Sequence, residues 1–174
     1  MSLHVIIDGY NLLGARGQMR AHSDHGRERL LQDLMEYRQQ KGHPMTVVFD
    51  GWRQNVATER HEHRAGVQVI YSRKGEQADQ VIQRLASQFG RDCAVVSSDR
   101  EVTDFARAQG ALVIGAGEFD TRLRAGREAG AQRSAAAYKV PDREGDVDRR
   151  RDKKGNPRKL PKAVRKRHRQ LKGF

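Results

Sequence analysis

The sequence predicts an α/β domain of three layers, in which helices cover both faces of a mostly parallel central sheet. Short apolar runs recur along the first two thirds of the chain, and stretches with helical spacing of apolar residues lie between several of them. Glycine or proline ends those helical stretches. Because alternating strands and helices imply right-handed crossovers, we expect the strands to be parallel.

Five apolar runs are the predicted strands. The first is almost uninterrupted, as expected for a strand that is buried on both faces. The only cysteine, Cys93, opens the fourth run and is expected to be a small buried side chain, since it has no partner for an internal disulfide. The five runs are residues 3–7, 45–49, 67–71, 93–97 and 112–114.

Three stretches carry apolar side chains at the three- and four-residue spacing of a helix. Each is followed by a glycine, the residue that most readily ends a helix. These predicted helices contain residues 30–37, before Gly42 and Pro44, residues 78–89, before Gly90, and residues 105–108, before Gly110.

Charge is distributed unevenly along the chain. The formal net charge is +12, and residues 134–174 contain 15 Lys and Arg against five Asp and Glu. Apolar periodicity also stops near Arg133, and residues 142–159 have the composition of a disordered segment. We therefore predict a nearly neutral folded domain, residues 1–133, followed by a basic, partly disordered extension, residues 134–174.

The basic extension favours nucleic acid as its partner, because clustered Lys and Arg gain affinity by releasing counterions from phosphates. A membrane surface fits less well, since few bulky apolar residues are present. A tail that only aids solubility is the alternative. A helix over residues 161–171 would carry four side chains for this contact, Arg165, Lys166, Arg167 and Arg169. With no leader or long apolar segment visible, we expect a cytoplasmic protein.

The segment 52–66 is polar, and no periodicity identifies its structure. His61 and His63 invite a zinc interpretation, but histidines two residues apart face different ways on a helix, and no cysteine lies nearby. We expect a solvated loop or helix that contacts a polyanion instead.

Carboxylates follow four of the predicted strands, at the edge where α/β sheets bind their ligands. Asp8 and Asp50 end the first two strands, and Asp99 follows the fourth. Glu76 and Asp79 follow the third strand and open a helix, where their spacing places them on one face. Two carboxylates about 4 Å apart repel each other by about 4 kcal/mol at an effective dielectric of 20. A divalent cation removes that repulsion, and Mg²⁺ suits such oxygen ligands.

Each acid also has an ordinary explanation. An Asp-Gly pair is common in turns, which accounts for Asp8 and Asp50. Asp99 would cap the next helix, and Glu76 and Asp79 would favour a helix dipole. The convergence of all five on one edge makes a metal site the better interpretation.

A metal held by these acids indicates phosphodiester hydrolysis, because a bound metal activates water and stabilises the leaving oxygen. No Ser-His-Asp set is visible, and Cys93 is expected to be buried rather than activated. Three basic residues beside the acids would hold substrate phosphates or are simply surface charges, namely Arg73, Lys74 and Arg100.

Four segments of the chain have the order and spacing of a known motif set. They read Val-Ile-Ile-Asp-Gly-Tyr-Asn-Leu-Leu at 5–13, Val-Val-Phe-Asp-Gly at 47–51, Glu-Gln-Ala-Asp at 76–79 and Val-Ser-Ser-Asp at 96–99. Together they resemble the YacP-type NYN domains of the PIN-like nuclease superfamily, over roughly the first 125 residues. The resemblance implies a PIN-like fold and a Mg²⁺- or Mn²⁺-dependent endoribonuclease. It also implies single-stranded or structured RNA, including ribosome-associated RNA, as the target.

The resemblance also implies roles by motif position. Asp8, Asp79 and Asp99 would bind metal, and Asn11 would orient Asp8 or a metal-bound water. Glu76 matches the acid that precedes the helical Asp of the family. Many NYN proteins carry another Asp two residues after the position of Asp99, where this chain has a glutamate. The identity of the fourth acid is therefore open among Asp104, Glu101 and Asp50.

We expect a cytoplasmic, metal-dependent endoribonuclease that hydrolyses RNA, with the ribosome as a further partner and no membrane contact. The alternative is an RNA- or ribosome-binding factor that keeps the PIN-like fold with little or no nuclease activity. A toxin-like nuclease with an antitoxin partner is a third hypothesis, for which the chain offers no support.

Overall fold

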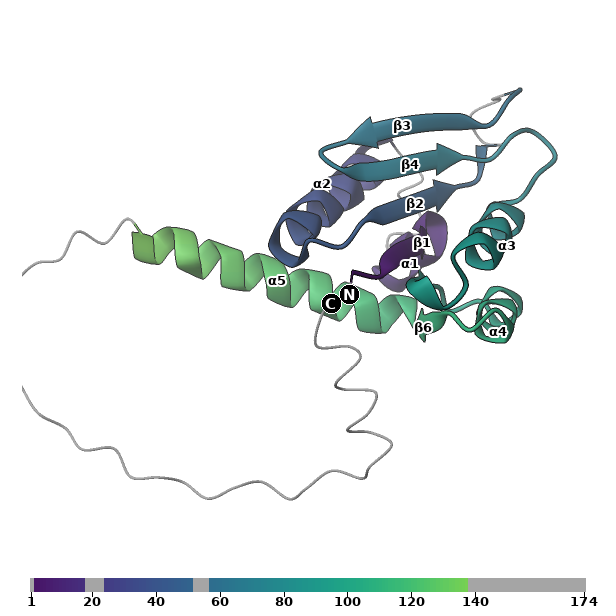
Figure 1. The fold of residues 1–174 in the computed structure, drawn as a ribbon. Coiled ribbons are helices and arrows are strands. Elements are labelled where there is room, and N and C mark those ends of the chain that lie inside the picture. The colour runs from purple at the N-terminus through teal and green to yellow at the C-terminus, as the bar shows by residue number, and fades with distance from the viewer. Residues whose placement is uncertain (1, 18–23, 52–56, 138–174) are drawn as a thin grey trace, which may run out of the picture. The chain divides into compact units, whose positions relative to one another are not determined.

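The structure is a computed structural model that describes residues 2–17, 24–51 and 57–137. In these ranges six strands form one sheet in the order β3-β4-β2-β1-β5-β6 (Figure 1). All neighbouring strands are parallel except β3, which pairs antiparallel with β4 at one edge. The strands are β1 (His4–Asp8), β2 (Met45–Phe49), β3 (Arg60–Arg64), β4 (Val67–Tyr71), β5 (Cys93–Val96) and β6 (Leu112–Ile114).

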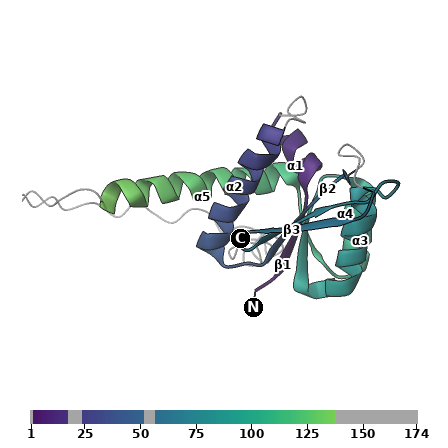
Figure 2. The same cartoon turned by 90° about the horizontal axis from the view of Figure 1, so that it is seen from above.

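Helices cover both faces of this sheet. Seen along the sheet in Figure 2, α3 and α4 lie on one face, whereas α1, α2 and the beginning of α5 lie on the other. The predicted three-layer α/β architecture with a mostly parallel sheet is thus confirmed. The helices are α1 (Gly9–Ala15), α2 (Asp24–Lys41), α3 (Ala78–Phe89), α4 (Arg100–Ala108) and α5 (Ala116–Ala137), with a short 3₁₀ helix at Gly90–Asp92.

The chain divides into two compact units, residues 1–129 and 130–174. Of the second unit, the structure describes only residues 130–137, the end of α5. The predicted helix over residues 161–171 and its basic side chains lie outside the described residues, so the division into a domain and a basic extension stays a prediction. None of the helices in the described ranges has both the length and the hydrophobicity of a transmembrane span.

The five predicted strands correspond to β1, β2, β4, β5 and β6, with differences of one residue at some ends. The three predicted helices lie within α2, α3 and α4. The expectation for the segment 52–66 was wrong for residues 60–64, which form β3. A charged edge strand needs no apolar alternation, because its backbone pairs with β4 while charged side chains shield the open edge. A turn in which Ala65 and Gly66 both have positive φ joins the two strands.

The core on one face of the sheet is built from the apolar runs that predicted the strands. Ile6, Val48, Ile70 and Val95 come from four neighbouring strands and pack under α3 and α4. Cys93 is fully buried in the same cluster, as predicted, and burial raises the pKa of its thiol to about 11. A thiol in this state is a packing group and not a nucleophile.

Gly9 has a different role from the one its Asp-Gly sequence suggests. It does not form a turn but begins α1, and Asp8 is the N-cap of that helix. A Cβ at position 9 would lie 2.3 Å from Cε1 of Phe49 on the neighbouring strand. The glycine is therefore needed because the backbone passes directly against the Phe49 ring.

A buried ion-pair network joins α1, α2 and α5. Arg16, which follows α1, contacts Oδ2 of Asp33 through Nη1 at 2.7 Å and Oδ1 of Asp120 through Nε at 2.6 Å. The side chains of Arg16 and Asp120 are only 6% and 7% exposed. Removal of Asp120 leaves Arg16 paired with Asp33 but takes the acceptor from its buried Nε, which is a costly change.

Asp120→Ala is therefore expected to lower the free energy of unfolding by about 2 kcal/mol, as measured by urea denaturation. Asp104→Ala is the matched control, because Asp104 forms its ion pair with Arg107 at the surface and is 69% exposed. That control should change stability by less than about 0.5 kcal/mol. Equal effects of the two substitutions would show that the buried network does not hold the helices together.

Candidate active site

Acids from distant parts of the chain meet at one edge of the sheet, because β1, β2, β4 and β5 are parallel and end there. Asp8 is the last residue of β1, and Asp50 directly follows β2. Asp99 lies between β5 and α4, and Asp79 lies in the first turn of α3, the helix that follows β4. The ends of the strands and the start of α3 thus bring these four acids to the same edge of the sheet.

Asp8 is the most deeply buried of these acids, with 7% of the residue exposed. Its pKa is raised to about 6, mainly by burial and further by the charges of Asp79 and Asp50. Two hydrogen bonds oppose that rise. The backbone N–H of Asn11 donates to Oδ1 at 3.0 Å, and the hydroxyl of Ser97 donates to Oδ2 at 3.4 Å.

Asp79 is affected by the same group of charges. Its pKa is raised by burial first, and then by the charges of Asp99, Asp50 and Glu101. The charge of Asp79 raises the pKa of Asp8, and the charge of Asp99 raises that of Asp79, so Asp79 links the three acids predicted as metal ligands. Such a cluster attracts a cation.

The turn after β5 links the two ends of this cluster. The amide oxygen of Asn11 accepts from the backbone N–H of Ser98 at 2.9 Å. The hydroxyl oxygen of Ser97, which donates to Asp8, accepts from the backbone N–H of Asp99 at 3.1 Å. Asn11 and the two serines therefore hold the end of β1 and the start of α4 together, a role that goes beyond the orienting role expected for Asn11 alone.

Asp99 is the N-cap of α4, the role that the sequence indicated as the alternative to metal binding. Oδ1 accepts from the backbone N–H of Glu101 at 2.8 Å and of Val102 at 3.4 Å. Both capping bonds use the same carboxylate oxygen. Capping and a contribution to the acidic cluster are thus compatible in this residue.

Asp50 holds the start of α3. Its Oδ1 accepts from the backbone N–H of Ala78, the first residue of that helix, at 3.0 Å and from the hydroxyl of Ser72 at 3.2 Å. Oγ of Ser72 also accepts from the N–H of Gly51 at 3.0 Å. A Cβ at position 51 would lie 1.8 Å from the carbonyl oxygen of Ser72, so the two strand ends approach as closely as glycine allows. Asp50 thereby positions the helix that carries Asp79.

Two predicted metal ligands lie apart from this cluster. Glu76 precedes α3 rather than opening it, contrary to expectation, and its carboxylate pairs with Arg84 and Arg73. Asp104 is exposed and pairs with Arg107 at 2.8 Å. Neither acid is among the charges that raise the pKa of Asp8 or Asp79. Among the alternatives for the fourth acid, Asp50 and Glu101 are the two whose charges raise the pKa of Asp79, and the choice between them stays a prediction.

The predicted phosphate-binding residues are at the surface. Arg73 is 64% exposed, and Lys74 and Arg100 are exposed as well. Arg165, Lys166, Arg167 and Arg169 lie outside the described residues. Sequence reasoning missed Ser72, Ser97 and Ser98, although Ser97 ends a predicted strand and the other two directly follow one, which was the signal used for the acids.

The chemistry of the donors fits a hard divalent cation. The cluster consists of carboxylates whose charges disfavour one another, and oxygen ligands of this kind suit Mg²⁺ or Mn²⁺. Within the described ranges, no group of three Asp, Glu, His or Cys side chains is arranged closely enough to hold a metal ion. The roles of the individual acids therefore stay predictions.

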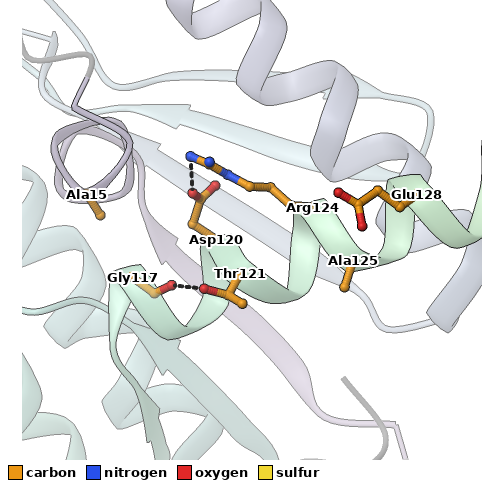
Figure 3. Close-up of a pocket in the computed structure, with 7 residues that line it drawn as sticks. All are labelled: Ala15, Gly117, Asp120, Thr121, Arg124, Ala125 and Glu128. Atoms are coloured by element: carbon orange, nitrogen blue, oxygen red, sulfur yellow. Dashed lines mark hydrogen bonds and ion pairs between the residues drawn. The ribbon is translucent and has the colours of Figure 1, made fainter.

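A pocket elsewhere on the molecule is not part of this cluster. It lies along α5 beside the end of α1 (Figure 3). None of the acids predicted as metal ligands lines it. Its lining residues are Ala15, Gly117, Asp120, Thr121, Arg124, Ala125 and Glu128.

Comparisons with known proteins agree with the motifs. The family model described as the YacP-like NYN domain matches residues 5–167, which reaches beyond the segments that carry the motifs. The uncharacterized protein YacP of Bacillus subtilis (strain 168) is 34% identical over 87 residues, a match that covers 47% of this chain and 50% of that protein. The alignment thus spans half the length of this curated relative.

Two crystal structures share the fold. Rae1 (YacP) from Bacillus subtilis aligns with a TM-score of 0.64 and 26% identity, over 79% of this chain and 82% of that chain. A single-substitution mutant of the same protein aligns with a TM-score of 0.66 and 24% identity, over 79% of this chain and 86% of that chain. At its lower identity, the second match supports the fold alone.

The raised pKa of Asp8 makes stability depend on pH. A carboxyl group whose pKa is higher in the folded state, about 6 against 3.8, stabilises the fold below pH 3.8, and that contribution is lost as the pH rises through 6. Asp8→Asn, which is always neutral, should therefore be more stable than the unmodified protein at pH 8 by about 2 to 3 kcal/mol. The difference should disappear toward pH 4. Urea denaturation in chelator at several pH values measures it, and a difference independent of pH would contradict this account.

The anchoring role of Asp50 is testable because asparagine keeps an oxygen acceptor and loses only the charge. Asp50→Ala should destabilise the protein by about 1 to 2 kcal/mol more than Asp50→Asn. It should also increase hydrogen exchange at the amide of Ala78, measured by NMR. If the asparagine and alanine variants behave alike, the charge of Asp50 matters and not its hydrogen bonds.

Proposed function

Since the chain belongs to the YacP-like NYN domain family, as its motifs indicated, we propose that it is a metal-dependent endoribonuclease. Membership makes this a PIN-like nuclease domain with a nucleic-acid substrate. RNA as that substrate, internal cleavage and a ribosome-associated target are parts of the proposal. The observation that supports it is the position of Asp8, Asp50 and Asp99 at the ends of parallel strands, where the charge of Asp79 acts on Asp8 and that of Asp99 acts on Asp79.

In this proposal Asp8, Asp79 and Asp99 hold Mg²⁺ or Mn²⁺. Such an ion, when bound, supplies an activated water and offsets the charge of the leaving oxygen. Asn11 and Ser97 fix the carboxylate of Asp8 through hydrogen bonds to its two oxygens. Asp50 fixes the start of the helix that carries Asp79. These bonds preorganise the acids, which lowers the cost of assembling the site around the substrate.

The exposed basic residues beside the acids would bind the RNA backbone. Lys74 and Arg100 each lie within a few residues of an acid of the cluster, so their charges are close to the reacting phosphate. The basic residues of the C-terminal extension, which include Arg165 and Arg169, would add sequence-independent affinity through counterion release.

A binding factor without nuclease activity is the second candidate. The observation in its favour is that no three potential ligands among the described residues are arranged to hold a metal ion. This candidate predicts RNA binding that is unaffected by chelator, and no cleavage at any metal concentration.

Cleavage of labelled single-stranded RNA by the purified full chain tests the proposal. We expect cleavage with Mg²⁺ or Mn²⁺ and none with chelator. Asp8→Asn and Asp79→Asn should each lower the rate by about 100-fold or more, because each removes a charge that the metal site needs. Asp92→Asn is the control, because Asp92 is exposed at the opposite end of β5 and should leave the rate unchanged.

Cleavage that persists in both Asp8→Asn and Asp79→Asn would overturn the proposal and point to a contaminating nuclease. Binding of RNA without cleavage under all metal conditions would establish the second candidate instead.

A further inference from the structure

A charged pocket of about 520 Å³ lies beside the beginning of α3, and none of the acids of the acidic cluster lines it. Three separate segments of the chain form it, namely the residues before β3, the loop between β4 and α3, and α3 itself. It is lined by Ala57, Thr58, Glu59, Arg73, Glu76 and Arg84.

Two glutamates hold two arginines in this pocket. Oε1 of Glu76 contacts Nη1 of Arg84 at 2.8 Å, and Oε2 contacts Nε of Arg73 at 3.3 Å. Nη2 of Arg84 also pairs with Glu59. The carboxylate of Glu76 therefore orients both guanidinium groups. This contact gives Glu76 a role other than metal binding.

The charges of the pocket are layered from inside to outside. The side chains of Glu76 and Glu59 are 10% and 23% exposed, whereas those of Arg73 and Arg84 are 64% and 51% exposed. The less exposed carboxylates thus hold the arginines, whose side chains remain more than half exposed to solvent.

We propose that Arg73 and Arg84 form a binding site for a phosphodiester group of single-stranded RNA, outside the bond that is cleaved. This inference rests on the proposed function. Guanidinium groups bind phosphate oxygens in a paired geometry, and their orientation by a carboxylate reduces the entropy lost on binding. Because Glu76 is only three residues before Asp79, an RNA strand that lies across the acids also passes this pocket.

This site assigns a positioning role to Glu76 in place of metal binding. It also adds Arg84, which carries no sequence signal because it lies in the middle of an amphipathic helix. Lys74 is exposed beside Arg73 and adds a further positive charge to the same surface.

The salt dependence of RNA binding tests the proposal. Fluorescence anisotropy would measure binding of a labelled single-stranded oligoribonucleotide to the full chain, in chelator so that no cleavage occurs, over a range of KCl concentrations. Arg73→Gln and Arg84→Gln should each weaken binding about fivefold. Their double variant should reduce the slope of log affinity against log salt by about 0.7 for the phosphate contact that is lost.

Arg107→Gln is the matched control, because Arg107 is also exposed and paired with an acid, but lies on α4. It should leave the slope unchanged. Thermal unfolding monitors folding, and Arg73→Gln carries the test if Arg84→Gln unfolds, since Arg73 has the single contact with Glu76.

An unchanged slope in the double variant, or an equal loss in Arg107→Gln, would overturn the proposal. The proposal would also be overturned if inorganic phosphate bound the chain in an Arg73-dependent way while RNA binding did not depend on Arg73. The pocket would then be a site for a free anion. If the unmodified chain cleaves RNA but the slope is unchanged, the inference fails and the proposed function stands. If the unmodified chain does not bind RNA, both fail.

Discussion

Repulsion between carboxylates at one edge of the sheet is the constraint on which the rest of the structure depends. Asp8 is buried at the end of β1 and is acted on by two further acids, which together with burial raise its pKa to about 6. A fold that places charges in this way loses stability unless other groups compensate. The surrounding hydrogen bonds are the compensation that the protein itself supplies.

That compensation comes largely from the beginnings of helices. Asp8 is the N-cap of α1, and Asp99 is the N-cap of α4. Asp50 accepts from the first backbone N–H of α3. In all three cases a carboxylate meets unpaired N–H groups and the positive end of a helix dipole. These contacts offset part of the repulsion between the carboxylates in the absence of a cation.

Much of the fold follows from apolar runs in the sequence, because the parallel strands are buried on both faces and need continuous hydrophobicity. β3 was missed because it is an edge strand whose pairing lies in the backbone and whose side chains are charged. α1 was missed because its few residues do not complete an apolar repeat, and α5 because polar residues and glycines interrupt its pattern.

The acids of the candidate site could be located from the sequence for the same reason, since each follows an apolar run. Their partners could not be assigned in this way. Glu76 and Asp79 are three residues apart, but only a structure reveals that one joins an arginine pair and the other the acidic cluster. Likewise, the contact between Ser97 and Asp8 joins strands whose pairing the sequence does not specify.

Paired strands differ in how far apart they lie in the sequence, and this difference bears on the order in which the protein folds. β3 and β4 are joined by the turn at Ala65 and Gly66, so their pairing closes a short loop. The pairing of β1 with β5 joins segments that are far apart in sequence, and the bond from Ser97 to Asp8 spans 89 positions. Because pairing distant segments is entropically slow, the hairpin precedes the acidic cluster. A chain still emerging during synthesis thus has no complete acidic cluster until β5 and the Asp99 that follows it have been made.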